Sequence, residues 1–324
     1  MLVLNSSFIS RFSKLGAGLQ IVRRLSVGKD LDLTGIYPPI PTPFNSDESI
    51  AWDKLKDNIK KWNEFPLRGY LVQGSNGEFC YLTEEERIEM IKVVKSLSPD
   101  KLVLAGSGCE STAATIRVTN KMAEAGADAA VVVTPCYYKG KMTIAALEDH
   151  FTRVADASSL PVILYSVPAN TSIDIPVELV RRLARHPNII GIKDSGGDVS
   201  KIGSMVHVTK GENFQILAGS ASYLLSALAV GASGGICGLA NVLPKEVCEL
   251  QTLFNEAKME DAKSLQHRLI APNAAVTKVH GPPGLKASLE WFGFYGGPCR
   301  RPLQPLTESE TKNLENAFKE NKYL

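Results

Sequence analysis

Eight short apolar runs recur along the chain after residue 34, and helix-like segments separate them. Nearly every residue within a run is apolar. This is the pattern of a strand that is buried on both faces of a parallel sheet. The predicted strands cover residues 36–38, 69–73, 102–106, 129–134, 162–165, 189–193, 215–218 and 234–237.

The segments between the runs carry signals for the start of a helix. Thr83 and Glu86 have the spacing of a capping box, and Ser111 or Thr112 can cap the next helix. Strands that begin about 19 to 33 residues apart and alternate with helices predict a closed (β/α)8 barrel, or TIM barrel. An open doubly wound sheet is the competing fold, but no G-x-G-x-x-G motif opens the first unit.

Only helices are expected after residue 238. They are predicted over residues 244–258, 260–279, 283–294 and 307–319, and Thr307 with Glu310 forms a second capping box. No linker separates them from the strands. We therefore expect a barrel over residues 30–240 and a C-terminal helical extension over residues 241–324 that packs on it.

The first 29 residues differ from the rest in charge. They are rich in serine and contain five basic residues and no acid. This composition is typical of a mitochondrial transit peptide, so we expect the protein in the mitochondrial matrix; a disordered basic tail is the alternative. The whole chain has a formal charge of +2, and no long apolar span is present. Neither a nucleic acid nor a membrane is therefore an expected partner.

Metal and cofactor chemistry have little support in the sequence. The six cysteines and five histidines show no zinc-binding spacing, no H-E-x-x-H motif and no C-x-x-C pair. We interpret the cysteines as small apolar residues. A G-x-S-x-G elbow and a Walker A loop are also missing, so we expect neither a serine hydrolase nor a P-loop enzyme, and we expect no cofactor.

Lys193 ends a predicted strand, and in a barrel the site is built where strands end. An ordinary lysine, with a pKa of about 10.4, is almost fully charged near neutral pH. Burial disfavours the cation and can produce a nucleophilic amine. Lys193 therefore suggests Schiff-base chemistry on a carbonyl substrate. The alternatives are a lysine that reaches solvent or one that pairs with Asp194.

Tyr165 ends the strand before that of Lys193, so we expect the two side chains to lie close together. A phenol at that place can move a proton to and from a substrate hydroxyl. A tyrosine that only caps the core is the alternative.

The turn at residues 73–78 contains Ser75 and Asn76 between two glycines. Its N–H groups, hydroxyl and amide suit a carboxylate, although a plain tight turn has the same composition.

Four motifs resemble, in order and spacing, those of the dihydrodipicolinate synthase/N-acetylneuraminate lyase superfamily. They are GSNGE at 74–78, VTP at 133–135 with a following tyrosine, YSVP at 165–168 and GIKD at 191–194. The resemblance extends over residues 35–300 and implies a lysine-dependent class I aldolase on a (β/α)8 barrel. It also implies a small 2-oxo acid substrate and a homo-oligomer, namely a homotetramer.

The resemblance also implies roles for individual residues. Lys193 would form the Schiff base, and Tyr165 would relay the proton. Ser75 would connect Tyr165 to a second tyrosine from a neighbouring subunit, which is Tyr137 or alternatively Tyr138. Ser75 and Asn76 would hold the substrate's C1 carboxylate, and we place Ser195 and Gly219 beside the rest of the substrate.

Within the superfamily, members that condense pyruvate with aspartate semialdehyde carry an arginine shortly after the YSVP-like run. This chain has Ala169, Asn170 and Thr171 there. Runs such as LAGSGCEST at 104–112 instead resemble the branch that cleaves 4-hydroxy-2-oxoglutarate to pyruvate and glyoxylate in hydroxyproline degradation. The alternatives are a dihydrodipicolinate synthase or N-acetylneuraminate lyase activity, or a ketoacid-binding barrel without catalysis.

Overall fold

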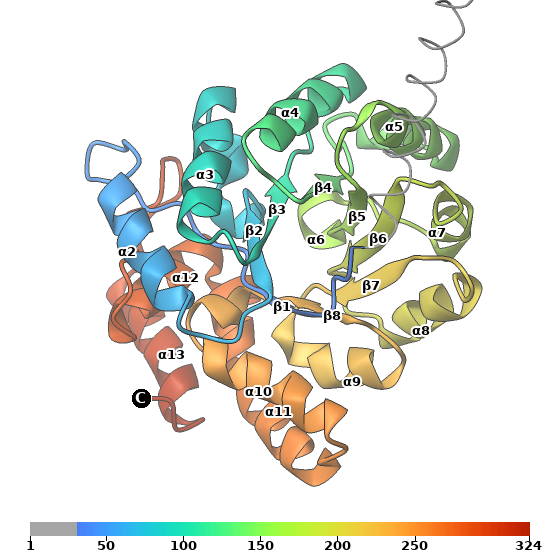
Figure 1. The fold of residues 1–324 in the computed structure, drawn as a ribbon. Helices are drawn as coiled ribbons and strands as arrows, with labels where there is room; N and C mark the ends of the chain where they lie inside the picture. Colours follow the sequence, from blue (N-terminus) through green and yellow to red (C-terminus); the bar gives the residue numbers. More distant parts are fainter. Residues whose placement is uncertain (1–30) are drawn as a thin grey trace, which may run out of the picture.

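The structure, a computed structural model, describes residues 31–324, so the transit peptide predicted over residues 1–29 lies outside the described residues. Eight parallel strands form a nearly closed barrel with helices around it, as Figure 1 shows. The predicted (β/α)8 barrel is therefore confirmed. The strands are β1 (Gly35–Tyr37), β2 (Gly69–Val72), β3 (Leu102–Gly106), β4 (Ala129–Val133), β5 (Val162–Ser166), β6 (Ile189–Asp194), β7 (Gln215–Ala218) and β8 (Gly234–Ile236).

Consecutive strands pair from β2 through to β8, and β8 pairs with β1. Hydrogen bonds close the remaining seam between β1 and β2, where the Arg68 N–H donates to the Ile36 carbonyl at 3.0 Å and the Leu71 N–H donates to the Pro38 carbonyl at 3.0 Å. All the carboxyl ends of the strands therefore face the same end of the barrel.

Helices follow the strands in the predicted order. Thr83 and Glu86 form the expected capping box, and Ser111 accepts a hydrogen bond from the Ala114 N–H, as a cap does. The helices between the strands are α2 (Trp52–Trp62), α3 (Glu84–Leu97), α4 (Thr112–Glu124), α5 (Ile144–Ala157), α6 (Pro168–Thr171), α7 (Val177–Leu183), α8 (Val199–Val208) and α9 (Leu224–Ala229).

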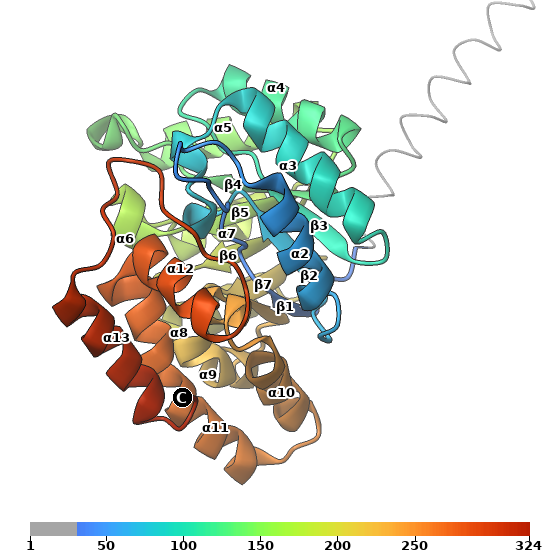
Figure 2. The ribbon, with the colours of Figure 1, turned by 90° about the vertical axis from the view of Figure 1, so that its left-hand side faces the viewer.

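Four helices follow β8, and they gather on one side of the barrel in Figure 2. They are α10 (Pro244–Asn255), α11 (Met259–Ala274), α12 (Gly281–Trp291) and α13 (Glu308–Lys319). A π-helical turn, η6 (Ala275–Val279), joins α11 to α12. α10 contacts β1 and α9 and so takes the place of the eighth barrel helix, beyond the boundary predicted at residue 240.

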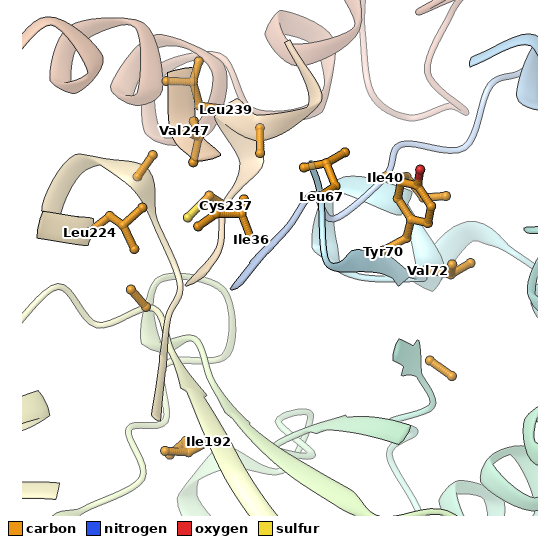
Figure 3. Packing of buried hydrophobic residues seen from close by; sticks show 14 of the residues in the cluster. Ile36, Ile40, Leu67, Tyr70, Val72, Ile192, Leu224, Cys237, Leu239 and Val247 are labelled. Atoms are coloured by element: carbon orange, nitrogen blue, oxygen red, sulfur yellow. The ribbon is translucent and has the colours of Figure 1, made fainter. Parts of the chain in front are cut away.

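Two layers of apolar side chains make up the core. Tyr37, Leu71 and Ile163 belong to the layer inside the barrel. Ile36, Tyr70 and Val72 point to the other side of their strands and pack beneath the helices (Figure 3). The strands are thus buried on both faces, as their continuous apolarity predicts.

All six cysteines fall within the described residues and are free thiols. Cys237 and Cys248 are buried, and burial raises the pKa of each thiol to about 12. The interpretation as small apolar residues fits these two buried thiols, whereas the Cys80 side chain is exposed. Among residues 31–324, no helix has both the length and the apolar character needed to cross a bilayer.

Candidate active site

Lys193 lies near the carboxyl end of β6, directly beside Tyr165 on β5. The register shifts between the two strands, because Val162 pairs with Ile189 whereas Ile163 pairs with Gly191. This bulge changes the alternation of β6, so Lys193 shares a face with Tyr165. The lysine is 3 % exposed, and its Nζ lies 3.9 Å from the centroid of the Tyr165 ring. The two residues therefore meet as the sequence predicts.

Asp194 does not pair with Lys193. Its Oδ2 lies 2.9 Å from the Nζ of Lys201, and its Oδ1 accepts a hydrogen bond from the Gly196 N–H at 3.0 Å. The carboxylate is fully buried and turned toward α8. The alternative of a Lys193–Asp194 ion pair is therefore excluded, because the neighbouring carboxylate bonds elsewhere.

The Tyr165 hydroxyl lies 3.3 Å from the Oγ of Ser75, so the predicted connection between these two residues is present. Burial raises the pKa of Tyr165, but the charge of Lys193 and the hydrogen bonds around the hydroxyl outweigh it. The pKa of this phenol is therefore held below its ordinary value of about 10. Such a group exchanges its proton more readily than a solvent-exposed tyrosine.

The loop after β2 is built from the short helical turn η1 (Ser75–Gly77) and Glu78. The Thr42 hydroxyl donates to the Gly77 carbonyl at 2.7 Å, and Glu78 adopts a left-handed conformation with φ of 54°. A Cβ on Gly238 would lie 2.8 Å from the Nδ2 of Asn76, so glycine at 238 leaves room for this amide. Ser75 and Asn76 are thus held at the end of the barrel.

A buried ion pair that was not predicted from the sequence supports this loop. Glu78 and Lys286 of α12 are each 1 % exposed, and their Oε1 and Nζ atoms lie 2.5 Å apart. The second carboxylate oxygen of Glu78 accepts the N–H of Arg300 at 2.9 Å, and the Arg300 guanidinium binds both oxygens of Glu86. Burial lowers the pKa of Lys286, although Glu78 favours its charged form. The C-terminal helices therefore fix the position of the loop.

Ser195 and Gly219 lie side by side at the ends of β6 and β7. The Gly219 N–H donates to the Asp194 carbonyl at 2.7 Å. A Cβ at position 219 would lie 2.0 Å from the Oγ of Ser195. Only glycine therefore leaves the Ser195 hydroxyl in its present place.

Tyr137 and Tyr138 are the exception among the predicted residues. Their side chains are 78 % and 71 % exposed, and they pack edge to face with ring centroids 5.0 Å apart. Glu110 accepts the N–H groups of Cys136 and Tyr137, at 3.0 and 2.9 Å, and so fixes the backbone of this loop. Within one chain, neither tyrosine reaches the other predicted site residues.

A cavity of about 500 Å³ opens over these groups. Six of the predicted residues line it, namely Ser75, Asn76, Tyr165, Lys193, Ser195 and Gly219. Ala169 and Asn170 also line the cavity. They stand in the segment after the YSVP run, where the resemblance places an arginine in members that condense pyruvate with aspartate semialdehyde. Three further lining residues were not predicted: Tyr223, whose hydroxyl donates to the Asp194 carbonyl at 2.8 Å, and Thr277 and Lys278 of the π-helical turn. Tyr223 lies 29 residues beyond the end of the lysine strand, and Thr277 and Lys278 lie more than 80 residues beyond it, so no local spacing connects them with Lys193.

No group of three or more possible metal ligands is present among residues 31–324.

Residues 32–321 match the model of the dihydrodipicolinate synthetase family. The chain belongs to this family. Its lysine, tyrosine and cavity are thus those of a class I, pyruvate-dependent aldolase or lyase of the dihydrodipicolinate synthetase family.

Individual relatives agree with this membership in the family. The chain is 32% identical over 284 residues to a 4-hydroxy-tetrahydrodipicolinate synthase of Methanothrix thermoacetophila, which covers 88% of this chain and 95% of the relative. It is 35% identical over 287 residues to the enzyme of the same name from Methanoculleus marisnigri, covering 88% and 98%. The family match over residues 32–321 spans the barrel and the added helices.

Solved structures of the dihydrodipicolinate synthetase family are similar as well. Dihydrodipicolinate synthase DapA-2 of Bacillus anthracis superposes with a TM-score of 0.85 at 31% identity, over 89% of this chain and 98% of that one. YagE of Escherichia coli K12, a prophage protein of the family solved in complex with pyruvate, has a TM-score of 0.84 at 29% identity, over 90% and 99%.

Proposed function

We propose that this protein is a class I aldolase that cleaves 4-hydroxy-2-oxoglutarate to pyruvate and glyoxylate. The observation that carries the proposal is the buried Lys193 amine, which faces Tyr165 in a cavity that has no carboxylate among its described lining residues. A site of this charge suits a dianionic ketoacid. The lysine supplies the covalent chemistry, so the reaction needs no further cofactor.

The proposed reaction begins when the Lys193 amine adds to the C2 ketone and water is expelled, which leaves an iminium ion. Tyr165 removes the proton of the C4 hydroxyl, and the electrons of the C3–C4 bond move into the iminium. Glyoxylate departs and an enamine remains. Protonation at C3 and hydrolysis of the C–N bond then release pyruvate and regenerate the lysine.

Ser75 and Asn76 would hold the C1 carboxylate during these steps, because their hydroxyl and amide line the cavity beside Tyr165. Ser195 would contact the C4 hydroxyl or the distal carboxylate. Its hydroxyl faces the same cavity and contributes to the lowered pKa of Tyr165.

A 4-hydroxy-tetrahydrodipicolinate synthase is the second candidate, since curated relatives carry that name. It would condense pyruvate with aspartate semialdehyde, which carries an ammonium group and a carboxylate. Against this candidate, Ala169 and Asn170 provide no guanidinium for the carboxylate. The cavity-lining residues also include no acid for the ammonium group.

The deciding experiment measures pyruvate and glyoxylate released from racemic 4-hydroxy-2-oxoglutarate, in parallel with condensation of pyruvate and aspartate semialdehyde. Borohydride reduction in the presence of pyruvate should attach the adduct to Lys193, as mapped by mass spectrometry. Lys193→Ala should lose both the adduct and turnover. Efficient condensation without cleavage would establish the second candidate instead.

Tyr165→Phe separates proton transfer from Schiff-base formation. We expect kcat to fall by roughly 10²- to 10⁴-fold, the usual contribution of a positioned acid or base. Borohydride trapping of pyruvate should remain, because Lys193 is intact. Unchanged turnover would remove Tyr165 from the relay.

We further propose a mitochondrial matrix location, a role in hydroxyproline degradation and a homotetrameric assembly. Fusion of residues 1–29 to a fluorescent protein tests the location, and light scattering of the purified protein tests the assembly. A cytosolic fusion or a stable monomer would contradict the respective proposal.

A further inference from the structure

The charge of the cavity is unbalanced. Among the described residues that line it, Lys193 and Lys278 are basic and none is acidic. Lys193 is committed to the ketone under the proposed function, and it becomes a cationic iminium when it reacts. Lys278 has no assigned role in the reaction, so the presence of a second cation in a site for small anions needs an explanation.

The turn that carries Lys278 is held firmly against the site. The Asn273 Nδ2 donates to the Ser220 hydroxyl at 2.8 Å, which ties the end of α11 to the loop after β7. The Thr277 hydroxyl donates to the Asn273 carbonyl at 2.6 Å. These bonds connect the π-helical turn η6 to the end of the barrel. π-Helical turns occur often at functional sites, since the extra residue redirects side chains.

η6 also lies close to the predicted carboxylate-binding amide. A Cβ on Gly238 would be 2.8 Å from the Nδ2 of Asn76 and 2.9 Å from the Cγ2 of Thr277, so these two side chains approach the same point. Lys278 follows Thr277 and lines the same cavity while remaining exposed. Lys278 is therefore on the solvent-exposed side of the cavity, whereas Lys193 is buried.

The Lys278 amine makes no ion pair or hydrogen bond with residues 31–324. By contrast, the buried Lys286 and Lys201 of α8 each pair with a carboxylate. An unpaired ammonium group on a flexible stem can bind an incoming carboxylate without first breaking a bond to the protein.

We propose that Lys278 is a specificity residue that binds the carboxylate distal to the ketone, so that the site selects five-carbon 2-oxo dicarboxylates over 2-oxo monocarboxylates. This inference rests on the proposed function for the identity of the natural substrate. The selectivity does not depend on the proposed function, because it can be measured with any 2-oxo acid that forms a Schiff base with Lys193.

The experiment compares borohydride trapping of 2-oxoglutarate with that of 2-oxopentanoate, which has a methyl group in place of the distal carboxylate. Wild-type protein should trap the dicarboxylate at lower concentration. Lys278→Met should reduce this preference by about tenfold, the size expected for one charged hydrogen bond at a partly exposed site. The loss should affect 2-oxoglutarate alone, so trapping of 2-oxopentanoate shows that the variant is folded.

Two variants serve as controls. Lys278→Arg keeps the charge and should retain most of the preference. Lys210→Met removes an exposed lysine from the turn between α8 and β7, at the opposite end of the barrel, and should leave the preference unchanged. An unchanged preference in Lys278→Met, or an equal loss for both ketoacids, would overturn the inference.

The result is independent of the cleavage assay. If the protein fails to cleave 4-hydroxy-2-oxoglutarate but Lys278→Met still removes the preference, the inference holds and the proposed function fails. If cleavage is efficient and the preference does not depend on Lys278, the proposed function holds and the inference fails.

Discussion

The loops after β2 and β4 both carry predicted site residues, but one is supported from within the chain and the other is not. The buried ion pair of Glu78 and Lys286 supports the loop that carries Ser75 and Asn76, and η1 of this loop contacts α12. The side chains of Tyr137 and Tyr138 instead extend into solvent, and Glu110 fixes only the backbone of this loop, at Cys136 and Tyr137. One chain therefore supports the loop of Ser75 and Asn76 from within, whereas the use of the exposed tyrosines in a neighbouring subunit stays a prediction.

The largest expected effect comes from breaking the support of the β2 loop. Glu78→Gln leaves the Lys286 ammonium group buried without its partner, so we expect a loss of about 3–5 kcal/mol in the free energy of unfolding. Urea denaturation measures it. Glu78→Gln combined with Lys286→Met should recover much of the loss, because no uncompensated charge remains.

The matched control is Glu85→Gln, since Glu85 is exposed on the first turn of α3. It should change stability by less than about 0.5 kcal/mol. Equal stability of the Glu78 and Glu85 variants would mean that the buried pair does not support the loop.

The next effect tests whether the β4 loop acts in a neighbouring subunit. Tyr137→Phe should lower kcat by about 10²-fold if the hydroxyl belongs to the proton relay, with stability almost unchanged because the side chain is exposed. Tyr138→Phe is the control and should have little effect. The reverse result would assign the role to Tyr138.

Mixed oligomers sharpen this test. When Tyr137→Phe and Lys193→Ala subunits are combined, a site with Lys193 from one subunit and Tyr137 from the other is intact. Activity should therefore rise above that of either variant when the two proteins are mixed. No recovery in verified mixed oligomers would place both residues in the same subunit's site.

The smallest effect concerns pH. The Ser75 hydroxyl is one of the groups that lower the pKa of Tyr165, so Ser75→Ala should raise that pKa. The deprotonated phenol accepts the substrate proton, so kcat/KM rises as the pH increases. In Ser75→Ala this rise should occur at higher pH. Ser204→Ala on α8 is the control, since its hydroxyl bonds only within the helix. A shift to lower pH would contradict the assigned direction.

Local patterns were sufficient for the fold and for much of the site. Continuous apolar runs require burial on both faces, and eight of them alternating with helices leave the barrel as the solution. The placement of Lys193 next to Tyr165 followed from neighbouring strand ends, and both line the cavity. The missing arginine at Ala169 and Asn170 was also visible in the chain itself.

Other features depend on residues that are far apart in the sequence. Glu78 and Lys286 are separated by 208 positions, and nothing near either residue indicates its partner. The bulge that turns Lys193 toward the barrel interior arises from pairing between β5 and β6. Lys278 lines the cavity only because α11, which precedes its turn, packs against the loop after β7.

The amino-acid sequence alone determined the barrel, the strand that carries the lysine and the residue types at the strand ends, since these follow from short-range periodicity and from the burial of apolar runs. Only the tertiary structure decided which charges meet, which amine stays unpaired and which tyrosines remain outside the cavity. The reason is physical: a charge interacts over a few ångströms of space, and folding brings together groups that the chain keeps hundreds of residues apart.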